Sequence, residues 1–279
     1  MDFRDDANLD SSQVEDVGGR GGGGRGGGGL PGGMVIGGGG IVSLIALVLV
    51  FVLNNVGGGG EPAQSQPPSN LAAQCQTGKD ADQSEKCQVV GVVNSIQDYW
   101  KTELPEYRLA KTVLYSGGVR TACGAADSSV GPFYCPGDQR VYLDLSFFDQ
   151  LQSQFGAKGG PFAQAYVIAH EYGHHVQNLL GALEGGSSVA TELQADCFAG
   201  VWAKNAYEGG FYEKPFTDNE IAEAIDAAAA VGDDRIQQRS GGRVDPDSFT
   251  HGSSKQRVEA FQRGYGTGNP AQCAATDLV

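Results

Sequence analysis

Three of the four histidines in this 279-residue chain lie close together, in the segment HEYGHH at positions 170–175. His170 and His174 are four residues apart, so on a helix their imidazoles project from one face and can bind one metal ion. Glu171 follows the first histidine directly and can act as general base on a water bound to that ion. The spacing therefore indicates hydrolysis by a metal-activated water. The alternative is an amphipathic helix whose histidines are ordinary surface residues.

The segment around these histidines has the pattern of an amphipathic helix. Its apolar residues recur at spacings of three and four. Pro161 suits a first helical turn, and Gly181 suits the position after the last one. His175 would point about 100° away from His174 on such a helix, so we expect that it does not bind the metal.

A catalytic zinc ion bound by two histidines needs a third protein ligand, because three ligands and a water are the usual arrangement. The segment GALEGGSS at 181–188 predicts a tight reversal into a second, antiparallel helix. Glu192 and Asp196 share one face of that helix. We predict that Glu192 is the third ligand and that Asp196 accepts the outer N–H of His170, which fixes its tautomer. The alternatives are the reverse assignment and a pair of solvated acids. Small side chains would let the two helices approach closely: Ala195, Ala199 and Ala203.

The fourth histidine, His251, begins the segment HGSSKQRVEAFQRGY, whose serines can cap a helix. A histidine or arginine that faces the metal could stabilise the oxyanion formed when water attacks a carbonyl. His251 is the first candidate for this role, and Arg257 and Tyr265 are others. In the alternative interpretation, His251 orients the loop and Arg257 forms a structural ion pair with a buried acid.

These motifs resemble the zinc peptidases with a glutamate ligand, and in particular the bacterial membrane-anchored family of putative neutral zinc metallopeptidases. The resemblance covers most of the chain after about residue 70 and includes HEYGH, ELQADCFAG, TACG, GPFYCPGDQRVYLDLSFF and HGSSKQRVEAFQRGY. It implies a zincin-like catalytic domain that acts on peptides or proteins. It also implies zinc bound by His170, His174 and Glu192, with Glu171 as the catalytic residue. Related zinc peptidases use a distal histidine or tyrosine for the oxyanion, which favours His251.

The first third of the chain predicts attachment to a membrane. Residues 1–33 are polar and glycine-rich, which predicts a disordered cytoplasmic tail. Residues 34–56 include an uncharged run of 20 residues, Met34 to Leu53, about the length that spans a bilayer. We expect a single uncleaved transmembrane helix here, with a signal peptide as the alternative. Arg20 and Arg25 precede it, so the amino terminus is expected inside and the catalytic domain outside the cytoplasmic membrane. Residues 57–70 would be a flexible linker, and residues 71–279 the catalytic domain.

All 6 cysteines follow the expected anchor, an even number that suits disulfides in an oxidising compartment. Six cysteines allow 15 pairings. Proximity in the sequence favours Cys75–Cys87 and Cys123–Cys135, which leaves Cys197–Cys273, and the family resemblance supports this last pair. Free thiols are the alternative.

Helical patterns dominate the catalytic region, and they lie near 90–104, around the two metal-binding motifs, at 218–231 and at 254–263. The one convincing strand, Gln139–Phe147, alternates with a period of two. We therefore expect an α+β fold, mostly helical, with a small sheet. This strand could be the edge onto which an extended substrate adds, and an ordinary core strand is the alternative.

The sequence thus predicts a zinc-dependent peptidase. Its net charge of −14 argues against a nucleic-acid partner. One alternative is an inert, membrane-anchored binding or scaffold protein that retains a zinc site. The other is a metal-dependent hydrolase of a non-peptide amide in the cell envelope. Glu171 counts against the scaffold, because a structural zinc site needs no general base.

Overall fold

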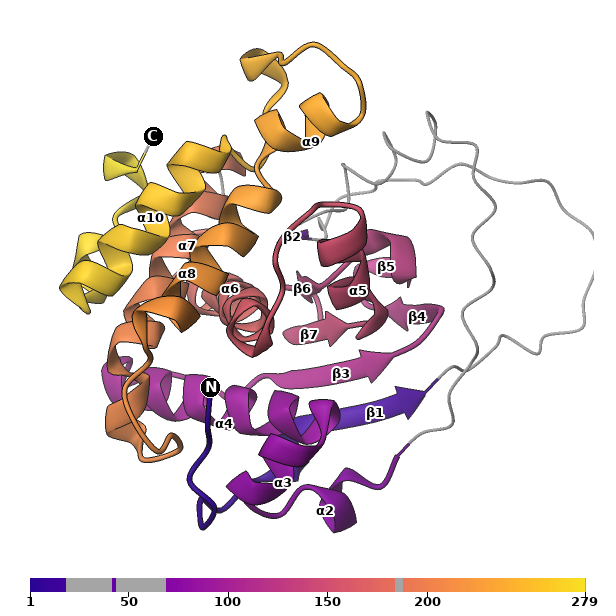
Figure 1. The fold of residues 1–279 in the computed structure, drawn as a ribbon, viewed down its shortest axis with the longest axis vertical. Coiled ribbons are helices and arrows are strands. Elements are labelled where there is room, and N and C mark those ends of the chain that lie inside the picture. Colours follow the sequence, from indigo (N-terminus) through magenta and orange to yellow (C-terminus); the bar gives the residue numbers. More distant parts are fainter. Residues whose placement is uncertain (19–41, 44–68, 184–187, 279) are drawn as a thin grey trace, which may run out of the picture.

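The computed structural model describes residues 1–18, 42–43, 69–183 and 188–278 (Figure 1). Helices predominate in this part of the chain and pack around a small sheet, so the predicted α+β class is confirmed. The helices are α2 (Leu71–Gln74), α3 (Gly78–Gln83), α4 (Glu85–Glu103), α5 (Ser146–Ser153), α6 (Pro161–Leu179), α7 (Ser188–Asn205), α8 (Asp218–Ala230), α9 (Asp233–Arg239) and α10 (Ser254–Thr267).

The main sheet has the strand order β1-β3-β7-β6-β2. Its strands are β1 (Val14–Gly18), β3 (Lys111–Tyr115), β7 (Arg140–Leu143), β6 (Phe133–Cys135) and β2 (Val42–Ser43). The first three run parallel, whereas β6 pairs antiparallel with both of its neighbours. A separate hairpin consists of β4 (Gly118–Thr121) and β5 (Gly124–Asp127).

The interpretation of Gln139–Phe147 as an edge strand that binds substrate is wrong, and the alternative, an ordinary core strand, agrees with the structure. The observed strand, β7, lies between β3 and β6, so both of its edges are already paired. The last two residues of the predicted strand, Ser146 and Phe147, belong instead to the first turn of α5. The Asp144 carboxylate accepts the backbone N–H of Ser146 at 3.0 Å, which favours the start of α5 there.

Close contacts between helices position the metal-binding motifs. A Cβ atom at Gly173 in α6 would lie 2.9 Å from the Cα atom of Ala195 in α7. Gly264 in α10 is constrained even more tightly, since its Cβ would lie 1.9 Å from the carbonyl oxygen of Cys197. The predicted close approach of the first two helices therefore occurs at Ala195, and α10 packs tightly against the other side of α7.

The amino-terminal residues differ from the prediction of a disordered tail. Residues 1–18 are folded, and Phe3, Leu9 and Val14 are buried in the main core. The glycine-rich composition that predicted disorder begins only after this segment. The few apolar residues of the segment are enough to anchor it in the core. Residues 19–33, the linker up to residue 68 and the predicted anchor apart from Val42–Ser43 lie outside the described residues. Within the described part of the chain, no helix has the length and apolarity needed to cross a membrane.

Three disulfides connect the cysteines in the predicted pairs, Cys75–Cys87, Cys123–Cys135 and Cys197–Cys273. The first two close short loops of 12 residues, whereas the third joins positions 76 residues apart and ties the carboxyl-terminal region to α7.

Candidate metal centre

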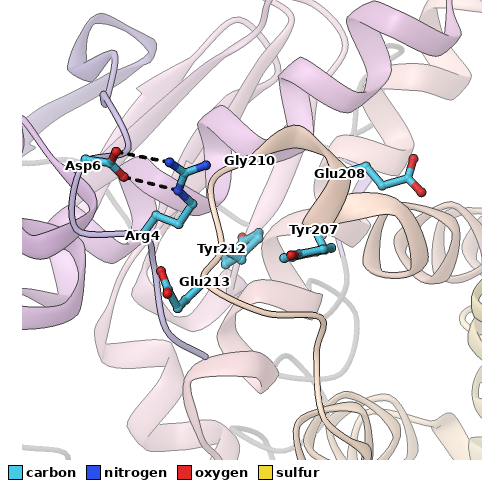
Figure 2. Close-up of a pocket in the computed structure, with 7 residues that line it drawn as sticks. All are labelled: Arg4, Asp6, Tyr207, Glu208, Gly210, Tyr212 and Glu213. Carbon is cyan, nitrogen blue, oxygen red and sulfur yellow. Dashed lines mark hydrogen bonds and ion pairs between the residues drawn. The ribbon is translucent and has the colours of Figure 1, made fainter.

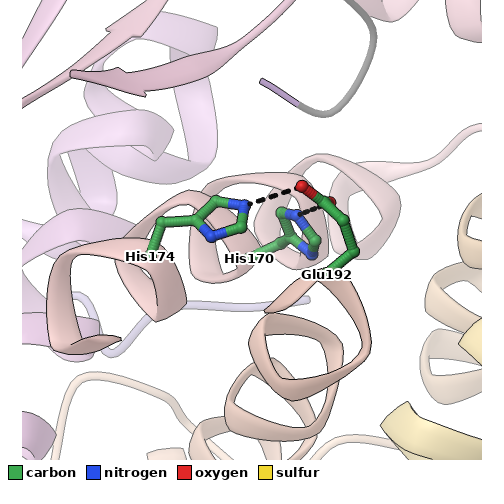
Figure 3. A group of neighbouring side chains, drawn as sticks. All are labelled: His170, His174 and Glu192. Atoms are coloured by element: carbon green, nitrogen blue, oxygen red, sulfur yellow. Dashed lines mark hydrogen bonds and ion pairs between the residues drawn. The ribbon is translucent and has the colours of Figure 1, made fainter. Parts of the chain in front are cut away.

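Two helices bring His170, His174 and Glu192 together in the protein interior (Figure 3). The Nε2 atom of His170 lies 3.1 Å from Glu192 Oε2, and that of His174 lies 3.5 Å from Glu192 Oε1. One ligand atom from each residue lies within 4.8 Å of the other two. The three predicted ligands are therefore close enough to share one ion.

The outer nitrogen of each histidine already has a partner. His170 Nδ1 lies 2.8 Å from Asp196 Oδ1, and His174 Nδ1 lies 2.8 Å from Gln177 Oε1. Both partners are acceptors, so each Nδ1 carries the proton and each Nε2 keeps a lone pair directed at Glu192. His174 Nε2 has no hydrogen-bond partner. Two imidazole nitrogens and a carboxylate are a zinc donor set, and these residues fit a zinc ion.

Gln177 is a site residue that the sequence reasoning missed. It is fully buried, and its amide group donates to Thr191 O at 2.7 Å and to Gln194 Oε1 at 3.0 Å. These bonds fix which end of the amide faces His174. The available signal was a glutamine three residues after the second histidine, on the same helix face.

Asp196 accepts hydrogen bonds from several sides. Besides His170, the Tyr166 hydroxyl donates at 2.6 Å, and Arg257 donates through Nε at 2.8 Å and Nη2 at 2.9 Å. Burial alone would raise the pKa of Asp196, but the charge of Arg257 and the interactions with His170 lower it to about 2. Asp196 is therefore an ionised acceptor for His170 at neutral pH.

Arg257 is fully buried and lies on the outer side of His170, 3.3 Å from its Nδ1 atom. This position corresponds to the alternative interpretation of Arg257 as a structural ion pair with a buried acid. Tyr265 stacks on Phe261 and lies beneath Lys204. Neither side chain lies against the inner nitrogens of the ligands, so both are poorly placed to reach an oxyanion there.

Glu171 is buried beside the ligands, and neither of its carboxylate oxygens has a hydrogen-bond partner. Burial raises the pKa of Glu171 to about 8, although His170 acts in the opposite direction. The backbone amide of Tyr134 in β6 also lies close enough to lower this pKa. An acid that titrates near neutrality is suited to accepting and returning a proton.

His251 is buried, and its imidazole is oriented by Asp233. His251 Nδ1 lies 3.2 Å from Asp233 Oδ1, and Asp233 Oδ2 accepts the backbone N–H groups of Thr250, His251 and Gly252. Burial would lower the pKa of His251, but Asp233 and the nearby Glu192 raise it. Asp233 is a second residue that the sequence reasoning missed, since it lies 18 positions before its partner at the start of α9.

His175 does not belong to the ligand group. Its Nε2 atom donates to the carbonyl oxygen of Arg108 at 2.6 Å, and its Nδ1 atom accepts from the Tyr134 hydroxyl at 3.0 Å. Both nitrogens are thus occupied by the structure around them, in agreement with the expectation that His175 does not bind the metal.

A family described as putative neutral zinc metallopeptidases matches residues 1–276. The chain belongs to this family. An uncharacterized Mycobacterium tuberculosis protein, Rv2575, is 51% identical over 224 residues, which cover 74% of this chain and 76% of that protein. The uncharacterized Escherichia coli protein YpfJ is 45% identical over 226 residues, 75% of this chain and 77% of its own. No solved structure matches the chain. The family match includes the folded amino-terminal segment as well as the metal centre.

Proposed function

We propose that the protein is a zinc-dependent peptidase with Glu171 as general base. One observation carries this proposal: His170, His174 and Glu192 converge beside a buried glutamate whose carboxylate has no hydrogen-bond partner. A zinc site with a purely structural role needs no such group. The family description supports the same activity and a peptide or protein substrate.

When bound, zinc lowers the pKa of a water towards neutrality and polarises the carbonyl under attack. Glu171 accepts the proton of the attacking water and passes it to the leaving amine. In the metal-free site burial raises the pKa of this carboxyl group, and the charge of a bound zinc ion would lower it, which would leave Glu171 ionised and able to accept the proton. Asp196 and Gln177 hold the two imidazoles in the tautomer that presents a lone pair to the ion.

His251 donates a hydrogen bond to the oxyanion in this proposal. Asp233 orients the ring through Nδ1, and we assign the hydrogen bond to the oxyanion to the Nε2 side of the ring. The raised pKa of His251 favours its protonated form, which stabilises negative charge best. The negative charge of Glu192 also favours the protonated form of His251, because it contributes to the rise in that pKa.

The three disulfides support an oxidising compartment outside the cytoplasmic membrane as the place where the domain works. The apolar run at residues 34–53 supports attachment to that membrane.

A cleavage assay on casein, with the full chain, tests the proposal. The zinc-loaded protein should cleave, a chelator should abolish cleavage, and zinc should restore it. Glu171→Gln should bind one equivalent of zinc and lose roughly 10²–10⁴-fold in activity. Glu106→Gln, at an exposed position, is the matched control.

His251→Ala should also retain zinc, with a loss of about 10²–10³-fold in kcat. Full activity of Glu171→Gln would overturn the proposed role of that residue. A zinc-loaded wild type that cleaves neither casein nor a panel of extended peptides would overturn the peptidase activity itself.

A further inference from the structure

The first 18 residues are built into the same folded unit as the metal centre. We infer that the amino terminus lies in the same compartment as this centre, so that Gly18 and Ser69 lie on one side of the membrane. This inference does not depend on the reaction that the metal centre performs. It concerns the topology of the whole chain, for which the sequence predicted a single crossing with the amino terminus inside.

The first observation is the pairing of β1 with β3 in the main sheet. Val14 pairs with Thr112, Glu15 with Val113 and Asp16 with Leu114, in parallel register. Figure 1 shows β1 beside β3, on the opposite side of it from β7. Because β3 is an interior strand only when β1 is present, the sheet of the catalytic domain includes the amino-terminal segment.

The second observation is a slot in α4 that fits Phe3. A Cβ atom at Gly91 would lie 2.5 Å from the Phe3 ring, so only glycine leaves room for this side chain. The ring packs against Tyr212 with a centroid distance of 4.8 Å and is 3% exposed. Residues from α4 and from the loop before α8 therefore enclose the amino-terminal segment.

The third observation is that buried amides on α4 hydrogen-bond with the segment. The Asn94 side chain accepts from the backbone N–H of Asp10 at 2.7 Å and donates to its carbonyl oxygen at 3.0 Å. One turn further, the Gln97 amide group donates to Gln13 Oε1 at 2.7 Å. Both α4 amides are buried, and a buried polar group without a partner is costly. This face of α4 is therefore complementary to the segment.

A cavity of about 600 Å³ lies where the segment meets residues 207–213 (Figure 2). Arg4 pairs there with Asp6, at 3.1 Å, and both side chains are well exposed. Asp6 thus marks the segment at a position that a reagent in solution can reach.

The decisive observation is where the two ends of the intervening chain lie. Asp16 Oδ2 accepts the backbone N–H of Ser69 at 3.1 Å and also its hydroxyl, and it pairs with Lys86 Nζ at 2.7 Å. Residues 16 and 69 are therefore held side by side at one carboxylate. The hydrocarbon core of a bilayer is about 30 Å thick, so a single crossing between these residues would separate groups that are in direct contact. The single-crossing topology does not fit this structure.

Cysteine labelling of the full chain in intact cells tests the inference. Asp6→Cys reports on the amino-terminal segment, and Lys255→Cys, whose side chain is 82% exposed, reports on α10. A membrane-impermeant maleimide is applied before and after permeabilisation. We expect both variants to be labelled before permeabilisation, or both only after it. Asp5→Cys should give the same result as Asp6→Cys. Labelling of one variant before permeabilisation and of the other only afterwards would overturn the inference.

A cross-link provides an independent measurement. Glu15→Cys combined with Val113→Cys places two thiols at partner positions of β1 and β3, where neighbouring strands lie about 4.8 Å apart, within the range of about 4.4–6.8 Å between Cα atoms that a disulfide needs. We expect a disulfide within one chain, detected by mass spectrometry of the membrane-derived protein. Two free thiols at these positions, under conditions that preserve the three native disulfides, would contradict the packing on which the inference rests.

Discussion

Replacing Glu171 with glutamine should make the metal-free protein more stable at alkaline pH. The carboxyl group is buried and its pKa is about 8 in the fold, against an ordinary value of 4.5. Between these two values the folded state binds the proton that the unfolded state has released, so the free energy of unfolding falls as pH rises. Each pKa unit corresponds to about 1.4 kcal/mol. The wild type should thus lose about 4 kcal/mol between about pH 4 and pH 8, relative to Glu171→Gln.

Urea unfolding measures this difference directly, with the disulfides intact and a chelator present. At about pH 4 the two proteins should be nearly equal in stability, because a neutral carboxyl group and an amide have a similar shape. Near pH 8 the glutamine variant should be more stable, and Glu106→Gln should follow the wild type throughout. A difference between wild type and Glu171→Gln that is the same at both pH values would refute the assignment of a neutral, desolvated Glu171.

Three further predictions concern packing, two of them at the metal centre and one at the amino-terminal segment. Gly173→Ala would place its Cβ atom 2.9 Å from the Cα atom of Ala195. We expect the free energy of unfolding to fall by about 1–3 kcal/mol. Zinc binding should also weaken in a chelator competition, because α6 and α7 carry different ligands and the substitution would push them apart. Gly266→Ala, where a Cβ meets nothing within 4 Å, is the control and should leave zinc binding unchanged. Arg257→Met removes the cation beside Asp196 and should cost about 3–5 kcal/mol in urea unfolding at neutral pH; a loss below about 1 kcal/mol would contradict the ion pair. Phe3→Ala should cost about 3–5 kcal/mol, whereas Leu109→Ala, at a position 56% exposed, should have little effect on thermal unfolding.

Parts of the site could be predicted because they depend on local geometry. His170 and His174 share a helix face through the period of the α-helix, and so do Glu192 and Asp196. A short reversal between the two segments is enough to bring the pairs together. The same local reasoning gave the disulfides Cys75–Cys87 and Cys123–Cys135, whose partners are only 12 residues apart.

The sequence by itself therefore determined the candidate ligand group of His170, His174 and Glu192, the glutamate next to His170 as the proposed general base, and the helical character of the domain. The tertiary structure alone decided which groups orient them. Arg257 reaches Asp196 across 61 residues and Asp233 reaches His251 across 18, and such contacts depend on how α7, α9 and α10 pack. It also decided the places of β1 and β7 in the sheet, because a strand's pattern records which faces are buried and not which strand pairs with each edge. For the same reason, the sequence predicted a disordered tail at residues 1–18, and only the tertiary contacts of this segment showed that it belongs to the core.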